Sequence, residues 1–231
     1  MTSHSKRAFK NELYSQFARI GKALGSPQRL EFLDLLAQGE WNVEALANET
    51  HQSVANTSRH LQVLRGARLV DTRREGTTIF YRLADPAVFQ LWQALRDLGS
   101  VRLAEVAQLV DAYLHERQAM EAISCHELLQ RLHDHAVLVL DVRPPEEYAA
   151  GHIAGARSLP LDELAAGLRD LSPDTEIVAY CRGPYCVLAD DAIALLRARG
   201  FRARRLTGGF PDWRALGMPV ESNMLPGTDA Q

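Results

Sequence analysis

A chain of 231 residues is long enough for two modest domains, each with its own hydrophobic core. Its 46% of hydrophobic and 24% of charged residues are typical of soluble globular proteins, and no window is long and apolar enough to span a bilayer. The first residues lack the apolar stretch of a secretory signal, and three cysteines, an odd number, do not suit a disulfide framework. We therefore expect a cytoplasmic protein with reduced thiols and no membrane contact.

The charge is unevenly distributed along the chain. Residues 1–100 contain 13 basic and 10 acidic residues, a net charge of +3, whereas residues 101–231 contain 13 and 19, a net charge of −6. Residues 53–82 contain six arginines but only two acidic residues, Asp71 and Glu75. A basic segment in an acidic chain indicates either a local contact with a polyanion or an unevenly charged solvated surface.

The first half of the chain contains a helix-turn-helix pattern. A helix is predicted from Pro27, a favoured first residue that follows the N-cap residue Ser26, and Gly39 ends it. A second, short helix fits residues 43–48, and a third follows the N-cap residue Ser53. A short helix, a turn and a longer helix predict a helix-turn-helix motif.

The third helix, residues 53–65, has two different faces. Its predicted buried stripe consists of Val54, Thr57, Leu61 and Leu64. The opposite face carries small or hydrogen-bonding side chains, which suit the reading of base edges in a major groove. The residues of this helix and its cap that we expect to contact DNA are Ser53, Asn56, Ser58, Arg59 and Gln62.

A β-hairpin is predicted directly after this helix. Residues 69–74 and 77–83 are rich in β-forming side chains and flank a turn at Glu75 and Gly76. Near its tip, Arg73 and Arg74 are placed to contact the phosphate backbone beside the recognition helix. A helix-turn-helix followed by a basic hairpin predicts a winged helix.

The segment SRHLQVLRGARLVDTRREGTTIFYRLADP closely resembles the ArsR family of bacterial dimeric winged-helix repressors, and the resemblance covers about Phe17 to about Tyr113. It implies a homodimer formed through the first helix and the last helix, the latter running roughly from Pro86 to Glu116. It also implies binding to palindromic double-stranded DNA operators, with release when an inducer binds.

The chain departs from this family at a metal site. Many members carry a metal-binding Cys-x-Cys on the helix before the recognition helix, where this chain reads VEALANET. Asp111 and His115 form an i, i+4 pair that matches half of another metal site of the family, but the remaining ligands are not apparent. We therefore expect no bound metal and no cofactor.

The second half of the chain alternates strands and helices. Ser124 and Glu127 form a capping box that opens a helix. The apolar runs AVLVLDVR and IVAYCRGPYC predict buried strands, the helical run VLADDAIALLRARG ends at Gly200, and FRARRL predicts a further strand. This order predicts an α/β domain with a mainly parallel sheet, whose ligands bind beyond the carboxyl ends of the strands. Cys181 lies at such an end.

Residues 181–186, CRGPYC, allow three interpretations: a metal site, a structural disulfide, or a nucleophile in an anion-binding loop. A metal site needs two further ligands at suitable spacing, and no second cluster of cysteine or histidine provides them. A static disulfide is disfavoured in a cytoplasm. A reactive thiolate is therefore the preferred interpretation.

The predicted chemistry of this loop follows from its position before a helix. Backbone N–H groups and the positive end of the helix dipole surround the start of such a loop, so the pKa of the Cys181 thiol is expected to be low. Arg182 adds positive charge, and Gly183, Pro184 and Tyr185 complete the predicted anion cradle.

Another cysteine, Cys125, lies in the first turn of a predicted helix, where its pKa is also expected to fall. No residue pairs with it in the sequence, and we treat it as incidental.

The segments LDVRPPEEYAAGHIAGARSLP and LTGGFPDWRALGMPVE resemble the two signatures that flank the active loop of single-domain rhodaneses, the sulfurtransferases, over about residues 124–221. The resemblance implies that Cys181 accepts sulfur and that Asp141, Arg143 and His152 support the site. Rhodaneses commonly have arginine as the sixth loop residue, where this chain has Cys186. The departure disfavours thiosulfate as a donor and places a second thiol near Cys181. It predicts a persulfide on Cys181 followed by attack from Cys186, which leaves a Cys181–Cys186 disulfide or a sulfur-bridged pair. The alternative for Cys186 is a small buried residue that opens the helix.

Together these patterns predict two domains: a mainly α winged helix-turn-helix domain and an α/β rhodanese-like domain with a mainly parallel sheet. The expected boundaries are 1–118 for the DNA-binding and dimerisation domain, 119–123 for a linker, 124–221 for the rhodanese-like domain and 222–231 for a tail. We expect a homodimeric repressor that binds operator DNA and senses a sulfane sulfur donor, a small molecule or a protein persulfide, at Cys181. The alternatives are a working sulfurtransferase that carries a DNA-binding module, and a repressor that responds to arsenate-like oxyanions.

Overall fold

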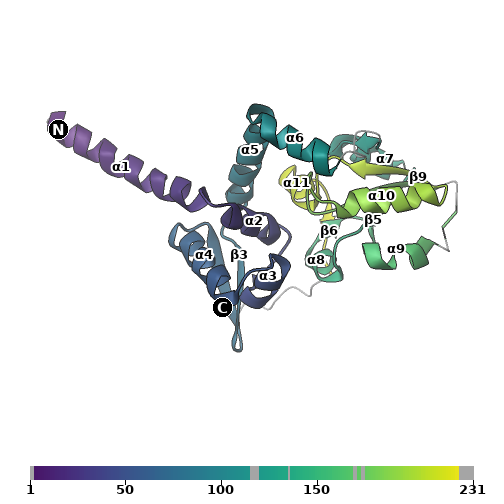
Figure 1. Cartoon of the computed structure of the whole chain (residues 1–231), viewed down its shortest axis with the longest axis horizontal. Helices are drawn as coiled ribbons and strands as arrows, with labels where there is room; N and C mark the ends of the chain where they lie inside the picture. Colours follow the sequence, from purple (N-terminus) through teal and green to yellow (C-terminus); the bar gives the residue numbers. More distant parts are fainter. Residues whose placement is uncertain (1–2, 115–119, 135, 169–170, 173–174, 224–231) are drawn as a thin grey trace. The chain divides into compact units, whose positions relative to one another are not determined.

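The computed structural model describes residues 3–114, 120–134, 136–168, 171–172 and 175–223 (Figure 1). The chain forms two compact units, residues 1–93 and residues 94–231, called unit 1 and unit 2 below. The predicted fold class is confirmed, because unit 1 contains a winged helix-turn-helix and unit 2 contains a parallel sheet with helices. No described helix is long and apolar enough to cross a membrane.

Unit 1 combines helices with a small antiparallel sheet of strand order β1-β3-β2. Its helices are α1 (Ser3–Leu24), α2 (Pro27–Leu36), α3 (Val43–Glu49), α4 (Val54–Gly66) and the first half of α5 (Pro86–Arg102). Its strands are β1 (Trp41–Asn42), β2 (Val70–Glu75) and β3 (Thr78–Leu83). The core lies between α2, α3, α4 and the sheet and contains Phe32, Leu46, Leu61 and Leu64.

The helix-turn-helix matches its prediction closely. The Asn42 side chain caps α3 by accepting a hydrogen bond from the Ala45 N–H at 2.8 Å, and Ser53 caps α4 by accepting one from the Asn56 N–H at 3.3 Å. Of the predicted buried stripe on α4, the structure buries Thr57, Leu61 and Leu64. The prediction for Val54 is wrong: its side chain is 47% exposed, because it is the first residue of the helix and lies beyond the core.

Strands β2 and β3 form an antiparallel hairpin in which Val70 pairs with Leu83 at one end and Glu75 pairs with Thr78 at the other. The turn between the strands contains Gly76, whose φ of +59° lies in the left-handed region that glycine adopts without strain. The predicted wing is therefore present.

The prediction of one long helix from Pro86 to Glu116 is wrong over its described part. Helix α5 ends at Arg102, and a separate helix α6 (Ala104–Tyr113) begins after Leu103, whose φ of −108° and ψ of 104° are extended. Arg102 and Leu103 both have high helix propensity, but the weak helix formers Gly99 and Ser100 lie in the turn before the break. Glu116 lies outside the described residues.

Unit 2 contains a five-stranded parallel sheet of order β4-β9-β8-β5-β7. Its strands are β4 (Ala122–Ile123), β5 (Leu138–Asp141), β7 (Arg157–Ser158), β8 (Glu176–Tyr180) and β9 (Arg202–Leu206), and β6 (His152–Ile153) pairs separately with β10 (Val220–Glu221). Besides α6 and the second half of α5, its helices are α7 (Cys125–His133), α8 (Pro145–Ala150), α9 (Leu161–Gly167), α10 (Leu188–Ala198) and α11 (Phe210–Ala215). Strand β4 falls in the stretch that we expected to be linker, and it extends the sheet by pairing with β9.

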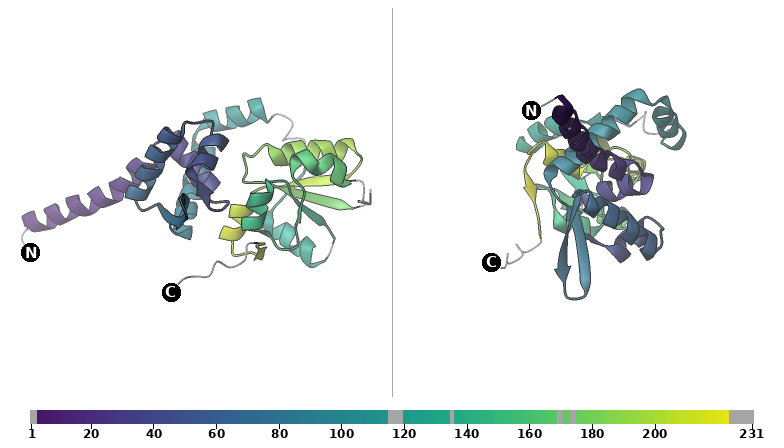
Figure 2. Two further views of the ribbon diagram at one scale, coloured as in Figure 1. Left: turned by 90° about the horizontal axis from the view of Figure 1, so that it is seen from below. Right: turned by 90° about the vertical axis from the view of Figure 1, so that its left-hand side faces the viewer.

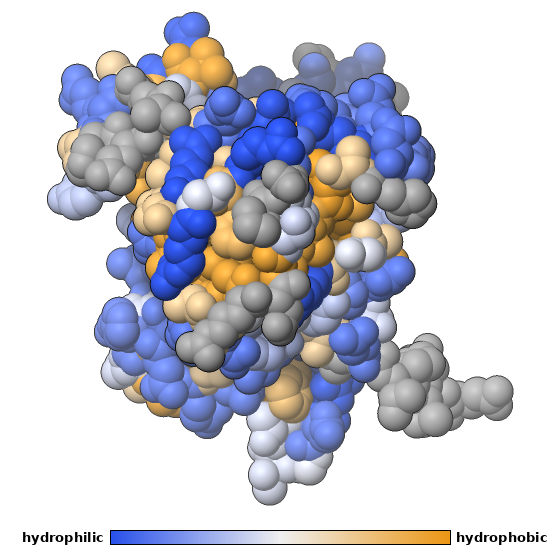
Figure 3. All heavy atoms as spheres, turned by 90° about the vertical axis from the view of Figure 1, so that its right-hand side faces the viewer, coloured by the Kyte–Doolittle hydropathy of each residue, from blue (hydrophilic) through white to orange (hydrophobic). Residues whose placement is uncertain are grey.

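Strand β8 contributes to two hydrophobic clusters because its side chains alternate between the faces of the sheet. Ile177 and Ala179 join the cluster that includes α9 and α10, whereas Val178 and Tyr180 join the cluster that includes α7 and α11. The sheet is therefore covered by helices on both faces (Figure 2). Figure 3 shows the side that lies on the right in Figure 1, where an apolar area is surrounded by hydrophilic residues.

Candidate functional site

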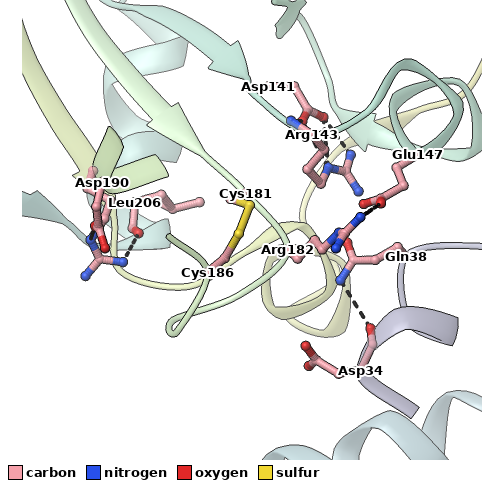
Figure 4. Close-up of a disulfide and its surroundings, with 11 residues drawn as sticks. Asp34, Gln38, Asp141, Arg143, Glu147, Cys181, Arg182, Cys186, Asp190 and Leu206 are labelled. Atoms are coloured by element: carbon pink, nitrogen blue, oxygen red, sulfur yellow. Dashed lines mark hydrogen bonds and ion pairs between the residues drawn. A yellow bond between two sulfur atoms is a disulfide. The ribbon is translucent and has the colours of Figure 1, made fainter. Parts of the chain in front are cut away.

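The structure places Cys181 directly after β8, at the carboxyl end of the parallel sheet. Its side chain is buried, and a disulfide joins it to Cys186, with 6.3 Å between the two Cα atoms (Figure 4). The sequence favoured a reactive thiolate at Cys181, disfavoured a static disulfide, and included a Cys181–Cys186 disulfide as one product of sulfur transfer. The structure shows this paired form, and residues 181–186 are called the sulfur loop below.

The sulfur loop rests on the turn that opens α11. The Phe210 N–H donates a hydrogen bond to the Cys181 carbonyl at 3.1 Å. A Cβ atom on Gly209 would overlap the backbone of Arg182 and Gly183, so only glycine permits this close approach. The glycine-rich turn before α11, which belongs to the segment that resembles the second rhodanese signature, therefore packs directly against the backbone of the sulfur loop.

Arg182 has a partner that the sequence did not reveal. Its Nε and Nη2 atoms lie 2.9 Å and 2.6 Å from Glu147 Oε1, and Figure 4 shows the two side chains meeting beside the loop. Glu147 is buried, and burial raises the pKa of its carboxyl group, an effect that Arg182 opposes. Within the described part of the chain, Glu147 Oε2 has no hydrogen-bond partner. The positive charge expected from Arg182 is therefore largely compensated.

A buried network holds the strand ends beside the loop. Arg143 and Asp141 are fully buried and form an ion pair of 2.6 Å, and Arg143 also donates to the Gly151 carbonyl at 2.7 Å. The Tyr180 hydroxyl donates to Asp141 Oδ2 at 2.5 Å and accepts from the Ile153 N–H at 3.1 Å. Burial and the nearby Asp141 raise the pKa of Tyr180 well above its usual value, so its hydroxyl stays neutral. Because Tyr180 precedes Cys181, this network fixes the start of the sulfur loop.

His152, the third residue expected to support the site, connects α8 to β6. Its Nδ1 atom lies 2.8 Å from the Tyr148 carbonyl oxygen, and its ring stacks on the Tyr148 ring at 3.7 Å between centroids. His152, like Asp141 and Arg143, thus contacts residues that hold the strands and helices around the loop in place.

The remaining loop residues differ in exposure. Gly183 is buried, Pro184 is half-buried, and the Tyr185 side chain is exposed, with its hydroxyl 2.5 Å from Ser100 Oγ. The Cys186 N–H donates to the Gly183 carbonyl at 3.2 Å. In this disulfide form the Cys186 amide is thus used by the loop backbone, and an anion cradle in the reduced form stays a prediction.

The pKa of the Cys125 thiol differs from the sequence-based expectation. Cys125 is buried at the start of α7, and burial together with the nearby Asp212 raises the pKa of its thiol to about 11. The expected lowering of this pKa is wrong, because desolvation outweighs the helix N-terminus.

The residues expected to contact DNA lie on α4 and the wing. Ser53, Arg59 and Gln62 are exposed, whereas Asn56 and Ser58 are half-buried. Two of the five also have local partners, because Ser53 caps the helix and Asn56 Nδ2 donates to Gln52 Oε1 at 2.8 Å. Arg59 and Gln62 are the exposed side chains of this set in the body of the helix.

The two wing arginines have different surroundings. Arg73 forms ion pairs of 2.8 Å with Glu40 and with Glu75 and lies over the Phe80 ring, 4.9 Å from its centroid. Arg74 is exposed, and its Nε donates to the Gly76 carbonyl at 3.0 Å. The charge of Arg73 is therefore compensated by two carboxylates, whereas Arg74 donates to an uncharged acceptor.

The metal site considered from the sequence is described only in part. Asp111 lies on α6, and His115 lies outside the described residues. Among the residues that the structure describes, no group of three or more histidine, cysteine, aspartate or glutamate side chains is placed to hold a metal ion.

Comparison with known proteins identifies two families. The model for bacterial regulatory proteins of the arsR family matches residues 26–72, and the model for the rhodanese-like domain matches residues 124–216. The chain is 45% identical over 212 residues to the HTH-type transcriptional regulator Rv0324 of Mycobacterium tuberculosis, a match that covers 92% of this chain and 93% of the relative.

Two further matches cover single parts of the chain. The chain is 34% identical over 100 residues to a sulfurtransferase of Allochromatium vinosum, over 42% of this chain and 92% of that protein. A solution structure of the homodimeric winged helix-turn-helix DNA-binding domain of Mb0332 from Mycobacterium bovis, a possible ArsR-family transcriptional regulator, is 44% identical, with a TM-score of 0.39. That match covers 41% of this chain and 87% of the other.

Proposed function

The chain belongs to the arsR family of bacterial regulatory proteins and carries a rhodanese-like domain, and from this premise we propose that it is a repressor that senses sulfane sulfur at Cys181. Both family resemblances expected from the sequence are confirmed. DNA binding through the helix-turn-helix follows from the first family. The proposal adds the chemical signal.

One observation carries this proposal: two cysteines at the ends of the sulfur loop are close enough to be joined. A rhodanese loop with a single cysteine holds its sulfur until an acceptor takes it. With a second thiol in the same loop, the arrival of sulfur at Cys181 instead leads to a disulfide that persists until it is reduced. A persistent product suits a sensor better than a catalyst.

The proposed chemistry has two steps. The Cys181 thiolate attacks a sulfane sulfur of an inorganic polysulfide, the bond to the rest of the polysulfide breaks, and the shortened polysulfide leaves. The Cys186 thiolate then attacks Cys181 Sγ, and hydrosulfide leaves as the disulfide forms. The two thiols lose two electrons, which reduce the sulfane sulfur to sulfide. A cellular dithiol restores the thiols by disulfide exchange.

We further propose that the regulator is a homodimer that reads a palindromic operator. Helix α1 supports this, because Phe9, Leu13 and Phe17 recur at helical spacing and are 59%, 38% and 59% exposed. Arg59 and Gln62 are the side chains of α4 proposed to read bases. Residues 1–118 and 124–221 remain the proposed extents of the two domains.

An operator titration tests the sensor proposal. Treatment of the reduced protein with polysulfide should weaken operator binding about 5- to 150-fold, the usual range of a coupling between two sites. Cys181→Ser should abolish the effect. Cys186→Ser should stop the reaction at a Cys181 persulfide, which mass spectrometry detects as one added sulfur atom. A folded wild-type protein in which Cys181 gains no sulfur and forms no disulfide would contradict the proposal.

The second candidate function is sulfur transfer to an external acceptor. The match to the Allochromatium vinosum sulfurtransferase favours it. Turnover assays with thiosulfate and with 3-mercaptopyruvate separate the two candidates, because a catalyst produces many equivalents of product, whereas a sensor stops at one sulfur transfer per chain.

A further inference from the structure

The second half of α5, which belongs to unit 2, contacts the support of the sulfur loop. Arg96 Nη2 lies 2.7 Å from Asp212 Oδ1, and the two side chains are 8% and 9% exposed. An ion pair shielded from water in this way is stronger and less sensitive to salt than a surface pair. Arg96 precedes the rhodanese-like match at residues 124–216, so this contact to Asp212 comes from outside the matched segment.

Asp212 connects Arg96 to the loop. Its other carboxylate oxygen, Oδ2, accepts a hydrogen bond from the Gly209 N–H at 2.9 Å and so holds the turn that opens α11. Gly209 lies against the backbone of Arg182 and Gly183, as described above. A chain of three contacts therefore leads from α5 through α11 to the sulfur loop.

A second contact reaches the loop directly. Ser100 Oγ, one turn after Arg96 on α5, lies 2.5 Å from the Tyr185 hydroxyl. Tyr185 is bonded to Cys186, so the position of its backbone depends on whether Cys186 is joined to Cys181. Breaking the disulfide would release this constraint on Tyr185, so its hydrogen bond with Ser100 is the contact of α5 best placed to respond to the two thiols.

The first half of α5 is held within unit 1. Val88 and Phe89 are buried there, and Trp92 Nε1 donates a hydrogen bond to Asp34 Oδ1 on α2 at 2.9 Å. One continuous helix therefore takes part in the packing of the DNA-binding unit and in the support of the sulfur loop.

We propose that Arg96 and Ser100 are positioning residues through which α5 responds to the state of the sulfur loop. Formation of the Cys181–Cys186 disulfide sets the position of Tyr185, its hydroxyl holds Ser100, and Arg96 keeps the second half of α5 on the α11 turn. In the dithiol form, the Tyr185–Ser100 bond is released. This inference rests on the proposed function and names the element that connects its two parts.

The test uses the full-length protein and two variants, Tyr185→Phe and Arg96→Gln. For each, the operator dissociation constant is measured before and after polysulfide, and the response is their ratio, so any change in basal affinity cancels. The matched controls are Tyr113→Phe on α6 and Arg102→Gln at the end of α5, both exposed. Mass spectrometry of the same samples records disulfide formation, and thermal unfolding confirms folding.

The expected result is a wild-type response of about 5- to 150-fold that falls toward one in both variants, while the disulfide still forms and both controls respond like the wild type. Variants that form the disulfide and keep the full wild-type response would overturn the inference. Loss of disulfide formation in the variants would also overturn it, since α5 would then control reactivity instead of responding to it. A wild-type protein with no response would contradict the proposed function itself.

Discussion

The charge beside Cys181 is controlled by Glu147, a residue 35 positions before Arg182 in the chain. Burying a carboxylate is unfavourable, and here burial raises the pKa of Glu147 while the Arg182 guanidinium opposes that effect. Because the negative charge of Glu147 neutralises the positive charge of Arg182, Arg182 attracts an anionic sulfur at residue 181 only weakly. We therefore propose that Glu147 restrains the reactivity of the reduced loop.

This restraint predicts the effect of Glu147→Gln. The amide keeps an acceptor for Arg182 but removes the negative charge, so the positive potential near Cys181 rises and the pKa of its thiol falls. The larger thiolate fraction outweighs the accompanying loss of intrinsic nucleophilicity, so sulfur uptake at a pH below that pKa should be about two- to threefold faster. The measurement is the rate of Cys181 modification as a function of pH, with the exposed neighbour changed by Glu146→Gln as the control. An unchanged pH profile would show that Glu147 does not control the thiol.

At the scale of elements, the wing presents two neighbouring arginines with different partners. Arg73 is compensated by Glu40 and Glu75, and these contacts raise its already high pKa. The Arg74 Nε instead donates a hydrogen bond to the uncharged Gly76 carbonyl. The negative backbone of DNA should therefore attract Arg74 more strongly than Arg73.

Salt dependence of operator binding distinguishes the two arginines. Arg74→Gln should weaken binding and reduce the slope of log affinity against log salt by about one, the loss of one phosphate contact. Arg73→Gln should reduce the slope by less, because its charge is already shared with carboxylates. Equal slopes for the two variants would contradict this difference.

The sequence predicted most elements because their signals are local. Helices α3 and α4 follow from N-cap residues and apolar periodicity, and the strands of unit 2 follow from apolar runs. The break at Leu103 has only a weak local signal, the Gly99-Ser100 pair one turn earlier, which did not outweigh the single helix over residues 86–116 that the family resemblance implied. Val54 was assigned to the core by periodicity alone, which does not reveal that the core ends before the first turn of α4.

The site was predicted less completely than the fold. Cys181 and Cys186 were identified by their spacing and by the strand before them. The contacts of Glu147 with Arg182 and of Arg96 with Asp212 join residues 35 and 116 positions apart, and periodicity carries no information about such pairs. The low pKa expected for Cys125 was wrong because burial, which the sequence pattern did not reveal, dominates it.

At the scale of the whole molecule, the proposed dimer predicts the effect of changes on α1. Phe9→Ser combined with Phe17→Ser should weaken dimerisation by about 2 kcal/mol or more, about thirtyfold, because two large apolar side chains would no longer be buried between subunits. Sedimentation equilibrium measures this change. The control is Lys10→Ser combined with Glu12→Ser, which leaves the net charge and the apolar face unchanged. A dimer of wild-type strength in the double phenylalanine variant would place the interface elsewhere.

The raised pKa of Cys125 allows the two loop thiols to be counted separately from this third cysteine. With a pKa of about 11, this thiol is almost entirely protonated at neutral pH, and the protonated thiol reacts slowly with alkylating agents. An alkylating agent such as iodoacetamide, applied briefly to the folded protein, should therefore label up to two sites when the loop is reduced and none when it is closed. The fraction of the regulator whose loop is closed at the moment of trapping then becomes readable in a living cell without any substitution in the chain.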